Sequence, residues 1–411
     1  MIPTQILTMW LTGLLSLGIL GGGIYLAHQW YQRSWSFDPL LQQSAFRPDF
    51  GLNEPTLLLA AAILSFLIAI TGKTLVRWML RLMLGGRSAS ADAHEPAPKQ
   101  TREGATRRER LVRPDGSELE VEIYGRDDHP PLILTHGWGL DSTAWYYAKR
   151  ELGQRYRLIV WDQPGLGLST RPRNRDFSLE KLAGDLHAVL PLAGDQPVIL
   201  VGHSIGGMIL LTFCRLFHEE LATRVAGLVL TSTTYTNPVR TVKGAPFFTA
   251  IETPVIKPLM YLTIALSPLV WLMNWMSYRN GSSHMTTKLT SFGGAETWDQ
   301  IDFAALFQAK ASPAVLARGM LGMLRYDATG TLGTIPSPTL VVPGEIDPVC
   351  KPEASERMRA AIPGAQLRAL PLSKHLGFLE HHPTYASYVE EFARSLEARE
   401  PRRGAASAAA F

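Results

Sequence analysis

One serine of the chain stands in a pattern that can make it a nucleophile. The segment VILVGHSIGG places Gly202 and Gly206 two residues on either side of Ser204. An apolar run that passes directly into a helical pattern predicts a sharp strand-to-helix turn, which the glycines permit because they lack a side chain. The alternative is that Ser204 only caps a helix. The pattern favours a hydroxyl raised above the end of a sheet, where it could attack an acyl carbon.

A serine hydroxyl needs a general base, and the base needs an acid to orient it. The segment SKHLGFLEHHP contains His375, on an expected loop after a final strand, and VVPGEIDPV contains Asp347. Glu345, two residues before Asp347, is the competing acid. His381 and His382 lie within the following helical stretch, where we expect surface histidines.

The elements that must position these residues are short apolar runs alternating with helical patterns. This alternation predicts an α/β fold with a mostly parallel, doubly wound sheet, and ligands of such sheets bind beyond the carboxyl ends of the strands. The expected strands are 118–124, 132–135, 158–161, 198–201, 228–231 and 339–342, and the expected helices are 142–153, 178–192, 205–219 and 352–362.

Together these motifs resemble the α/β-hydrolase family of serine esterases and lipases. LILTHGWG is similar to the family's oxyanion loop, and WDQPGLGLS is similar to its D-x-P-G-x-G-x-S segment. The resemblance covers residues 111–397 and implies a helical cap at about 238–325. It implies a catalytic triad of Ser204, Asp347 and His375, with the backbone N–H groups of Trp138 and Ile205 as oxyanion donors. Family members that attack with an aspartate, the dehalogenases and epoxide hydrolases, are excluded by Ser204.

The N-terminal fifth of the chain has a different composition. Residues 1–84 carry five Lys/Arg and three Asp/Glu, and no charged residue precedes Arg33. About 20 apolar residues suffice to cross a bilayer, so we expect two transmembrane helices, at about 6–27 and 55–72. Lys73, Arg77 and Arg81 recur every four residues and would extend the second helix as an amphipathic stretch at the headgroups. Two buried core helices are the less favoured alternative.

The remaining segments give the expected topology. Residues 85–110 are rich in small and charged residues and predict a flexible basic linker, and 398–411 predict a disordered tail. The chain carries a net charge of +4, but the excess lies at 73–113, beside the apolar helices. Lipid headgroups are therefore the expected partner, and nucleic acid is not. The positive-inside rule predicts two spans with both termini and the catalytic domain in the cytoplasm, at the inner membrane if the source is bacterial.

The expected cap contains an uncharged stretch, PLMYLTIALSPLVWLMNWM, at 258–276. It could be a lid that dips into the bilayer or a set of helices packed on the main domain, and the sequence leaves both open. With a membrane anchor it favours a lipophilic ester, such as a monoacylglycerol or lysolipid, cleaved through an acyl-enzyme. Acyl transfer, perhydrolysis and a non-catalytic membrane scaffold are the alternatives. No metal is expected, because Cys214 and Cys350 lack zinc-site spacing, and no organic cofactor is implied.

Overall fold

A computed structural model describes residues 2–40, 42–84 and 96–397. Within these residues an eight-stranded sheet has the order β10-β9-β8-β7-β5-β6-β4-β3. Its strands are β3 (Arg107–Val112), β4 (Glu118–Tyr124), β5 (Pro131–Thr135), β6 (Arg157–Trp161), β7 (Val198–His203), β8 (Val225–Thr231), β9 (Thr339–Val342) and β10 (Gln366–Leu367). All neighbouring strands are parallel except β3–β4 and β4–β6. The predicted α/β fold with a mostly parallel sheet is therefore confirmed.

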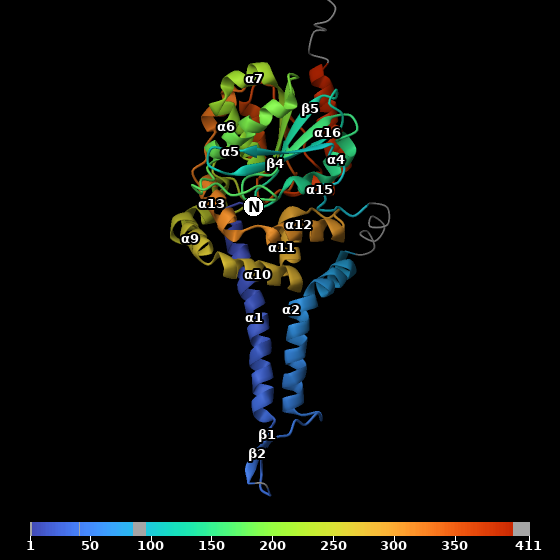
Figure 1. Ribbon diagram of the computed structural model, residues 1–411, viewed down its shortest axis with the longest axis vertical. Coiled ribbons are helices and arrows are strands. Elements are labelled where there is room, and N and C mark those ends of the chain that lie inside the picture. Colours follow the sequence, from blue (N-terminus) through green and yellow to red (C-terminus); the bar gives the residue numbers. More distant parts are fainter. Residues whose placement is uncertain (1, 41, 85–95, 398–411) are drawn as a thin grey trace, which may run out of the picture.

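Helices cover both faces of this sheet (Figure 1). Leu200 of β7 packs in the core shared with α5 (Leu179–Val189) and α6 (Ile205–Leu216). The flanking Ile199 and Val201 pack in a second core, with α4 (Tyr146–Leu152) and α16 (His382–Glu397). Every residue of β7 is buried, which is why the sequence reads as a continuous apolar run rather than an alternating one.

The cap is inserted between β8 and β9, close to the predicted 238–325. Its helices are α8 (Ala245–Ile251), α9 (Lys257–Ala265), α10 (Ser267–Asn280), α11 (Ser282–Ser291), α12 (Trp298–Lys310) and α13 (Pro313–Met323). The uncharged stretch forms α9 and α10, which meet at a bend of 98°. Met260 and Met273 are fully buried, whereas Tyr261, Leu266 and Trp271 are exposed, so the stretch both packs on the domain and presents an apolar surface.

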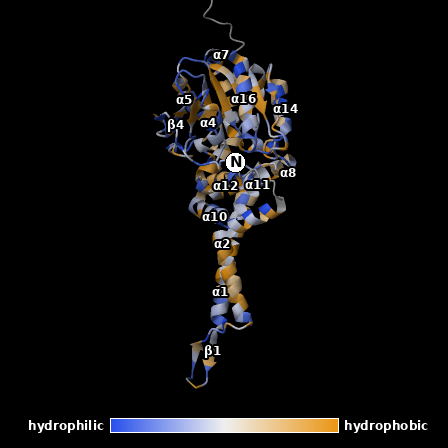
Figure 2. Cartoon of the chain, turned by 90° about the vertical axis from the view of Figure 1, so that its right-hand side faces the viewer, coloured by the Kyte–Doolittle hydropathy of each residue, from blue (hydrophilic) through white to orange (hydrophobic). Residues whose placement is uncertain are grey.

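Two long helices form a stem that projects from the globular part (Figures 1 and 2). They are α1 (Gln5–Arg33) and α2 (Glu54–Leu84), joined at the far end by the antiparallel strands β1 (Trp35–Asp38) and β2 (Gln43–Phe46). Both helices are long and apolar enough to cross a membrane, and both exceed the predicted 6–27 and 55–72.

The near end of the stem is docked on the cap, an arrangement that the sequence did not indicate. A side chain at Gly13 of α1 would collide with Met273 of α10, and one at Gly72 of α2 would collide with the Asn280 backbone. Ser16 hydrogen-bonds Ser277 across the same contact, with 3.0 Å between the two hydroxyl oxygens. The stem and the cap are therefore packed as one unit.

The predicted flexible linker over 85–110 is wrong for its described part. Residues 107–110 belong to β3, and Arg102 is 13% exposed, with ion pairs to Glu122 and, at 3.0 Å, to Asp162. Arg102 and Arg110 are paired with carboxylates of the domain, and a charged edge strand is a common way to end a sheet. Residues 85–95 and the predicted disordered tail at 398–411 lie outside the described residues.

Candidate active site

Ser204 lies on a strained turn between β7 and α6. Its φ of 55° and ψ of −119° are unusual for a residue other than glycine. The flanking glycines are required by close packing: a Cβ on Gly202 would lie 2.5 Å from the Gly206 backbone, and one on Gly206 would lie 2.2 Å from the Thr135 oxygen. The turn is held by two hydrogen bonds, one from the Ser204 N–H to the Thr231 oxygen at 2.9 Å and one from the Thr233 hydroxyl to the Ser204 oxygen at 2.6 Å.

The three residues expected to form a triad meet at the carboxyl end of the sheet. Ser204 Oγ lies 3.0 Å from His375 Nε2, and His375 Nδ1 lies 2.9 Å from Asp347 Oδ2. The second carboxylate oxygen of Asp347 accepts the backbone N–H groups of Val349 and Cys350 at 2.7 and 3.1 Å, which fixes the orientation of the carboxylate. All three side chains are buried.

The competing residues lie elsewhere. Glu345 accepts the Leu372 N–H at 2.8 Å and makes no contact with His375. The expectation that His382 lies on the surface is wrong. It is buried, stacks on Tyr147 at 3.9 Å between ring centroids and hydrogen-bonds Glu151. This imidazole joins α16 to α4, a contact between distant segments that its neighbours in sequence do not indicate.

The loop after β5 places Trp138 beside the triad. His136 fixes this loop, because its Nδ1 contacts the Gly137 oxygen at 2.9 Å and its Nε2 accepts the Gln163 N–H at 3.0 Å. The Trp138 indole is buried and donates to the Leu316 oxygen of α13 at 3.0 Å. Ile205 contributes the first amide of α6, and an amide in this position has no acceptor within its own helix. The amides of Trp138 and Ile205 remain the predicted oxyanion donors.

Two buried histidines near the triad are held neutral. Burial lowers the pKa of His203 well below its usual 6.5, and the neighbouring His375 lowers it further. Burial lowers the pKa of His136 to about 4. His203 Nε2 contacts the His375 backbone oxygen at 3.0 Å, so this side chain positions the loop that carries His375.

The same centre includes a group that could in principle ligate a metal. Asp347, Cys350 and His375 offer ligand atoms within 4.8 Å of one another. However, His375 Nδ1 and Asp347 Oδ2 already hydrogen-bond each other, and burial raises the pKa of the Cys350 thiol well above its usual 9.0. A thiol that stays protonated is a weak ligand, so these contacts suit an oriented histidine better than a metal site.

The N-terminal turns of α1 form part of the wall of the catalytic cavity. A cavity of about 40 Å³ beside His375 and Trp138 is lined also by Gln5, Thr287, Ser291 and Gln308. Ile2 packs with Val349 and Cys350, directly after Asp347. The sequence did not indicate Ile2 or Gln5, because a span was expected at about 6–27, no role was expected for the residues before it, and no local motif marks them.

Comparisons with known proteins identify the family of the chain. The family model described as the alpha/beta hydrolase fold matches residues 130–382, more than half of the chain. The chain therefore belongs to the α/β-hydrolase family. A pimeloyl-[acyl-carrier protein] methyl ester esterase of Nitrosospira multiformis is 29% identical over 286 residues, covering 67% of this chain and 98% of that protein.

Solved structures extend the comparison. A thermophilic esterase from Thermogutta terrifontis superposes with a TM-score of 0.56 at 25% identity, covering 71% of this chain and 99% of that one. A membrane phospholipase A described as a bacterial virulence factor has a TM-score of 0.56 at 20% identity, which shows the shared fold. It covers 83% of this chain and 96% of its own. The esterase relatives support a hydrolase of the esterase type.

Proposed function

We propose that this protein is a membrane-anchored serine esterase that cleaves lipophilic carboxylic esters. The observation that carries the proposal is the continuous chain from Ser204 Oγ through His375 to Asp347, with distances of 3.0 and 2.9 Å. It lies at the end of the sheet where ligands of such folds bind. The esterase relatives support the same reaction class.

The proposed reaction uses these groups in sequence. His375 Nε2 takes the proton of Ser204 as the hydroxyl oxygen attacks the ester carbon, and Asp347 stabilises the imidazolium that forms. The backbone N–H groups of Ile205 and Trp138 would hold the negative oxygen of the tetrahedral intermediate. His375 then protonates the leaving alcohol, which yields an acyl-enzyme. Water, activated by the same histidine, releases the acid.

Helix lengths support a position for the protein in the membrane. The far end of the stem carries the ion pair between Arg33 and Glu54, close to aromatic residues that suit an interface. A bilayer core about 30 Å thick requires about 20 helical residues. Counted from Arg33 and Glu54, this length ends near Gly13 and Lys73, and both positions contact the cap beside α10.

By this count, α10 would lie at the membrane surface nearer to the catalytic domain. The exposed apolar side chains of α9 and α10 would then enter the interfacial layer, among them Tyr261, Leu262, Leu269, Trp271 and Leu272. A lipophilic acyl ester is the substrate that this position favours. The match to a membrane phospholipase A covers 83% of this chain. Residues 96–397 alone are a smaller share, so the match includes residues outside them, and this supports a lipid-associated enzyme.

We infer a cytoplasmic catalytic domain from charge. The N-terminal end of α1 and the C-terminal end of α2 both lie at the globular part. The basic residues Lys73, Arg77 and Arg81 belong to this C-terminal part of α2. The positive-inside rule then predicts two spans in a bacterial inner membrane, with the β1–β2 turn on the far side. A cysteine placed at Ser44 of β2 should react with an impermeant maleimide in intact cells, and one placed at Glu356 of α14 (Pro352–Ala361) should not. The reverse labelling pattern would overturn this orientation.

The central experiment compares the wild type with Ser204→Ala and with Ser355→Ala, a control at a buried serine of α14. Ser204→Ala should abolish both fluorophosphonate labelling and ester hydrolysis across an acyl-chain-length series, whereas Ser355→Ala should retain them. Full activity in Ser204→Ala would contradict the proposed mechanism. A preference for short soluble esters would remove the lipid assignment. Transfer to an added alcohol or to peroxide in excess of hydrolysis would assign acyl transfer or perhydrolysis instead, and absence of labelling in the wild type would favour a scaffold.

A further inference from the structure

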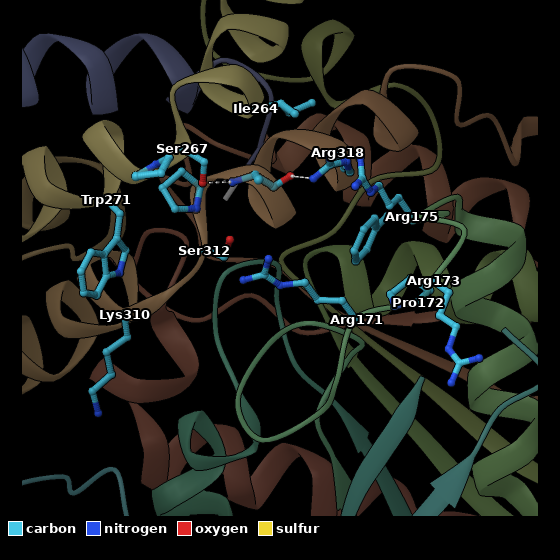
Figure 3. A pocket seen from close by; sticks show the side chains of 14 residues that line it. Arg171, Pro172, Arg173, Arg175, Ile264, Ser267, Trp271, Lys310, Ser312 and Arg318 are labelled. Atoms are coloured by element: carbon cyan, nitrogen blue, oxygen red, sulfur yellow. Dashed lines mark hydrogen bonds between the residues drawn. The ribbon is translucent and has the colours of Figure 1, made fainter. Parts of the chain in front are cut away.

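A wide groove between the cap and the loop after β6 has one cationic wall and one apolar wall (Figure 3). Its volume is about 980 Å³, far larger than the cavity beside His375. The positive charge of the groove comes from five residues, which are Arg171, Arg173, Arg175, Arg318 and Lys310. The apolar wall includes Ile264, Pro268 and Trp271 of α9 and α10, and no lining residue is acidic.

The guanidinium groups of this groove lack counter-charges. Within the part of the chain that the structure describes, the side chains of Arg171, Arg173 and Arg175 form neither an ion pair nor a hydrogen bond. Among the described residues, Arg318 donates one hydrogen bond, to the Ala314 backbone oxygen at 3.3 Å, and forms no ion pair. Burial and the positive charges of Arg175 and Arg171 lower the pKa of Arg318, which shows that the cluster repels itself. Such a cluster is stabilised by an anion, and planar guanidinium groups match the geometry of phosphate oxygens.

The location of the groove indicates where the anion would come from. Trp271 lies on α10, the helix that the stem crosses at the level assigned to the membrane surface. Next to it, Tyr261, Leu262, Leu266, Leu269 and Leu272 expose apolar side chains on α9 and α10. A molecule with a phosphate and an acyl chain could therefore place its phosphate among the arginines and its acyl chain along α9 and α10. A free phosphate would use only the cationic wall.

We propose that the groove lined by Arg171, Arg175 and Arg318 binds the phosphate of an anionic phospholipid headgroup. The acyl chains of that lipid lie along the exposed faces of α9 and α10. The proposal rests on the membrane position in the proposed function but not on its ester chemistry. The groove is also close to the catalytic cavity, because its Phe177 packs on Trp138 with 6.0 Å between ring centroids.

The test uses the full-length chain with Ser204→Ala, purified in an uncharged detergent, so that no ester turnover enters the measurement. Dioctanoyl-phosphatidylglycerol, dioctanoylglycerol and inorganic phosphate are titrated separately by calorimetry. The groove variant combines Arg171→Gln, Arg175→Gln and Arg318→Gln. The control variant removes the same charge elsewhere, through Arg126→Gln, Arg359→Gln and Arg394→Gln, all exposed arginines outside the groove.

Phosphatidylglycerol should bind at least about tenfold more weakly to the groove variant and within about twofold of the parent to the control variant, because charge-assisted hydrogen bonds are lost only in the first. Equal binding to both variants would overturn the proposal. If dioctanoylglycerol binds the parent protein as tightly as phosphatidylglycerol does, the phosphate is not recognised. If inorganic phosphate binds as tightly as phosphatidylglycerol does, the groove is a site for a free anion. If the triple variant fails to fold, Arg171→Gln alone, at an exposed side chain, should still weaken binding measurably. Since catalysis is absent throughout, a failure here leaves the esterase proposal untouched.

Discussion

At the scale of single residues, the orientation of His375 depends on a carboxylate that is itself fixed by the backbone. Asp347 uses one oxygen for His375 Nδ1 and the other for two amides of its own loop. Glu345 instead accepts a hydrogen bond from a loop amide, and its side chain is exposed. The sequence alone favoured Asp347, but only these contacts distinguish an acid that orients a base from one that closes a turn.

Asp347→Asn should lower kcat for a soluble ester by about 10³–10⁴-fold, because the amide can no longer hold the imidazole in the tautomer that accepts the serine proton. Glu345→Gln, the matched change two residues away, should stay within about twofold of the wild type. Steady-state kinetics of both variants checks the assignment. Equal losses would mean that the loop, rather than one carboxylate, is at fault.

Asp302 of α12 joins the cap to the stem. Its carboxylate accepts a hydrogen bond from the Tyr278 hydroxyl at 2.8 Å and lies 2.8 Å from His284 Nε2. It also forms an ion pair with Lys73 of α2 at 3.4 Å. These partners outweigh burial and lower the pKa of Asp302 from 3.8 to about 2. The folded-state value lies below the usual one, so the carboxylate stabilises the fold above about pH 4. That contribution is lost as the pH falls toward 2.

Asp302→Asn should therefore reduce the free energy of unfolding at pH 7 by about 1–2 kcal/mol, a value discounted because the side chain is 32% exposed. The melting temperatures of variant and wild type, measured in detergent between pH 7 and pH 3, should differ by a constant amount down to about pH 4 and converge below it. A difference that shrinks between pH 7 and 5 would point to His284 rather than to Asp302.

At the scale of elements, α1 has two roles along its length. Its first turns belong to the hydrophobic core: Ile6 is 0% exposed and lies in the cluster that contains Ile205 and Met208 of α6. Farther along, Leu11, Leu14 and Leu15 are exposed and suit a lipid environment. Apolar composition cannot separate these environments, because a protein core and a bilayer both favour leucine and isoleucine.

Ile6→Ala should cost about 2–5 kcal/mol of stability, since it leaves a cavity in a packed core. Leu15→Ala on the same helix, where the side chain is 54% exposed, should cost far less. Thermal unfolding of the two full-length variants in the same detergent is the measurement. Similar melting temperatures would show that the N-terminal turns are not docked.

At the scale of the whole molecule, the near end of the stem packs on the cap and into the hydrophobic core of the catalytic domain. Removal of residues 1–84 would uncover the cap surface around Met273 and the core around Ile256 and Met260. The cavity of about 40 Å³ beside His375 is lined jointly by Gln5 of α1, by Thr287 and Gln308 of the cap and by residues of the catalytic domain.

A chain that begins at residue 96 should therefore aggregate or melt at a markedly lower temperature than the full chain, instead of behaving as a soluble enzyme. Co-expression of residues 1–84 as a separate chain should restore it. As a control, replacement of residues 39–42, which connect β1 to β2 in the sequence, by a glycine-serine turn should leave stability unchanged. A well-folded soluble fragment from residue 96 would contradict the docked stem.

The sequence by itself determined the sheet, the order of the triad candidates and the two apolar helices, because each depends on local patterns: continuous apolar runs, a glycine-flanked serine and uncharged stretches of sufficient length. The tertiary structure decided that Arg102 and β3 belong to the domain, that His382 is buried and that Gln5 lines the catalytic cavity. It also gathered Arg171, Arg175 and Arg318 from two separate segments into one groove. These features arise from contacts between residues far apart in the chain, and their energies depend on partners that a local pattern does not contain.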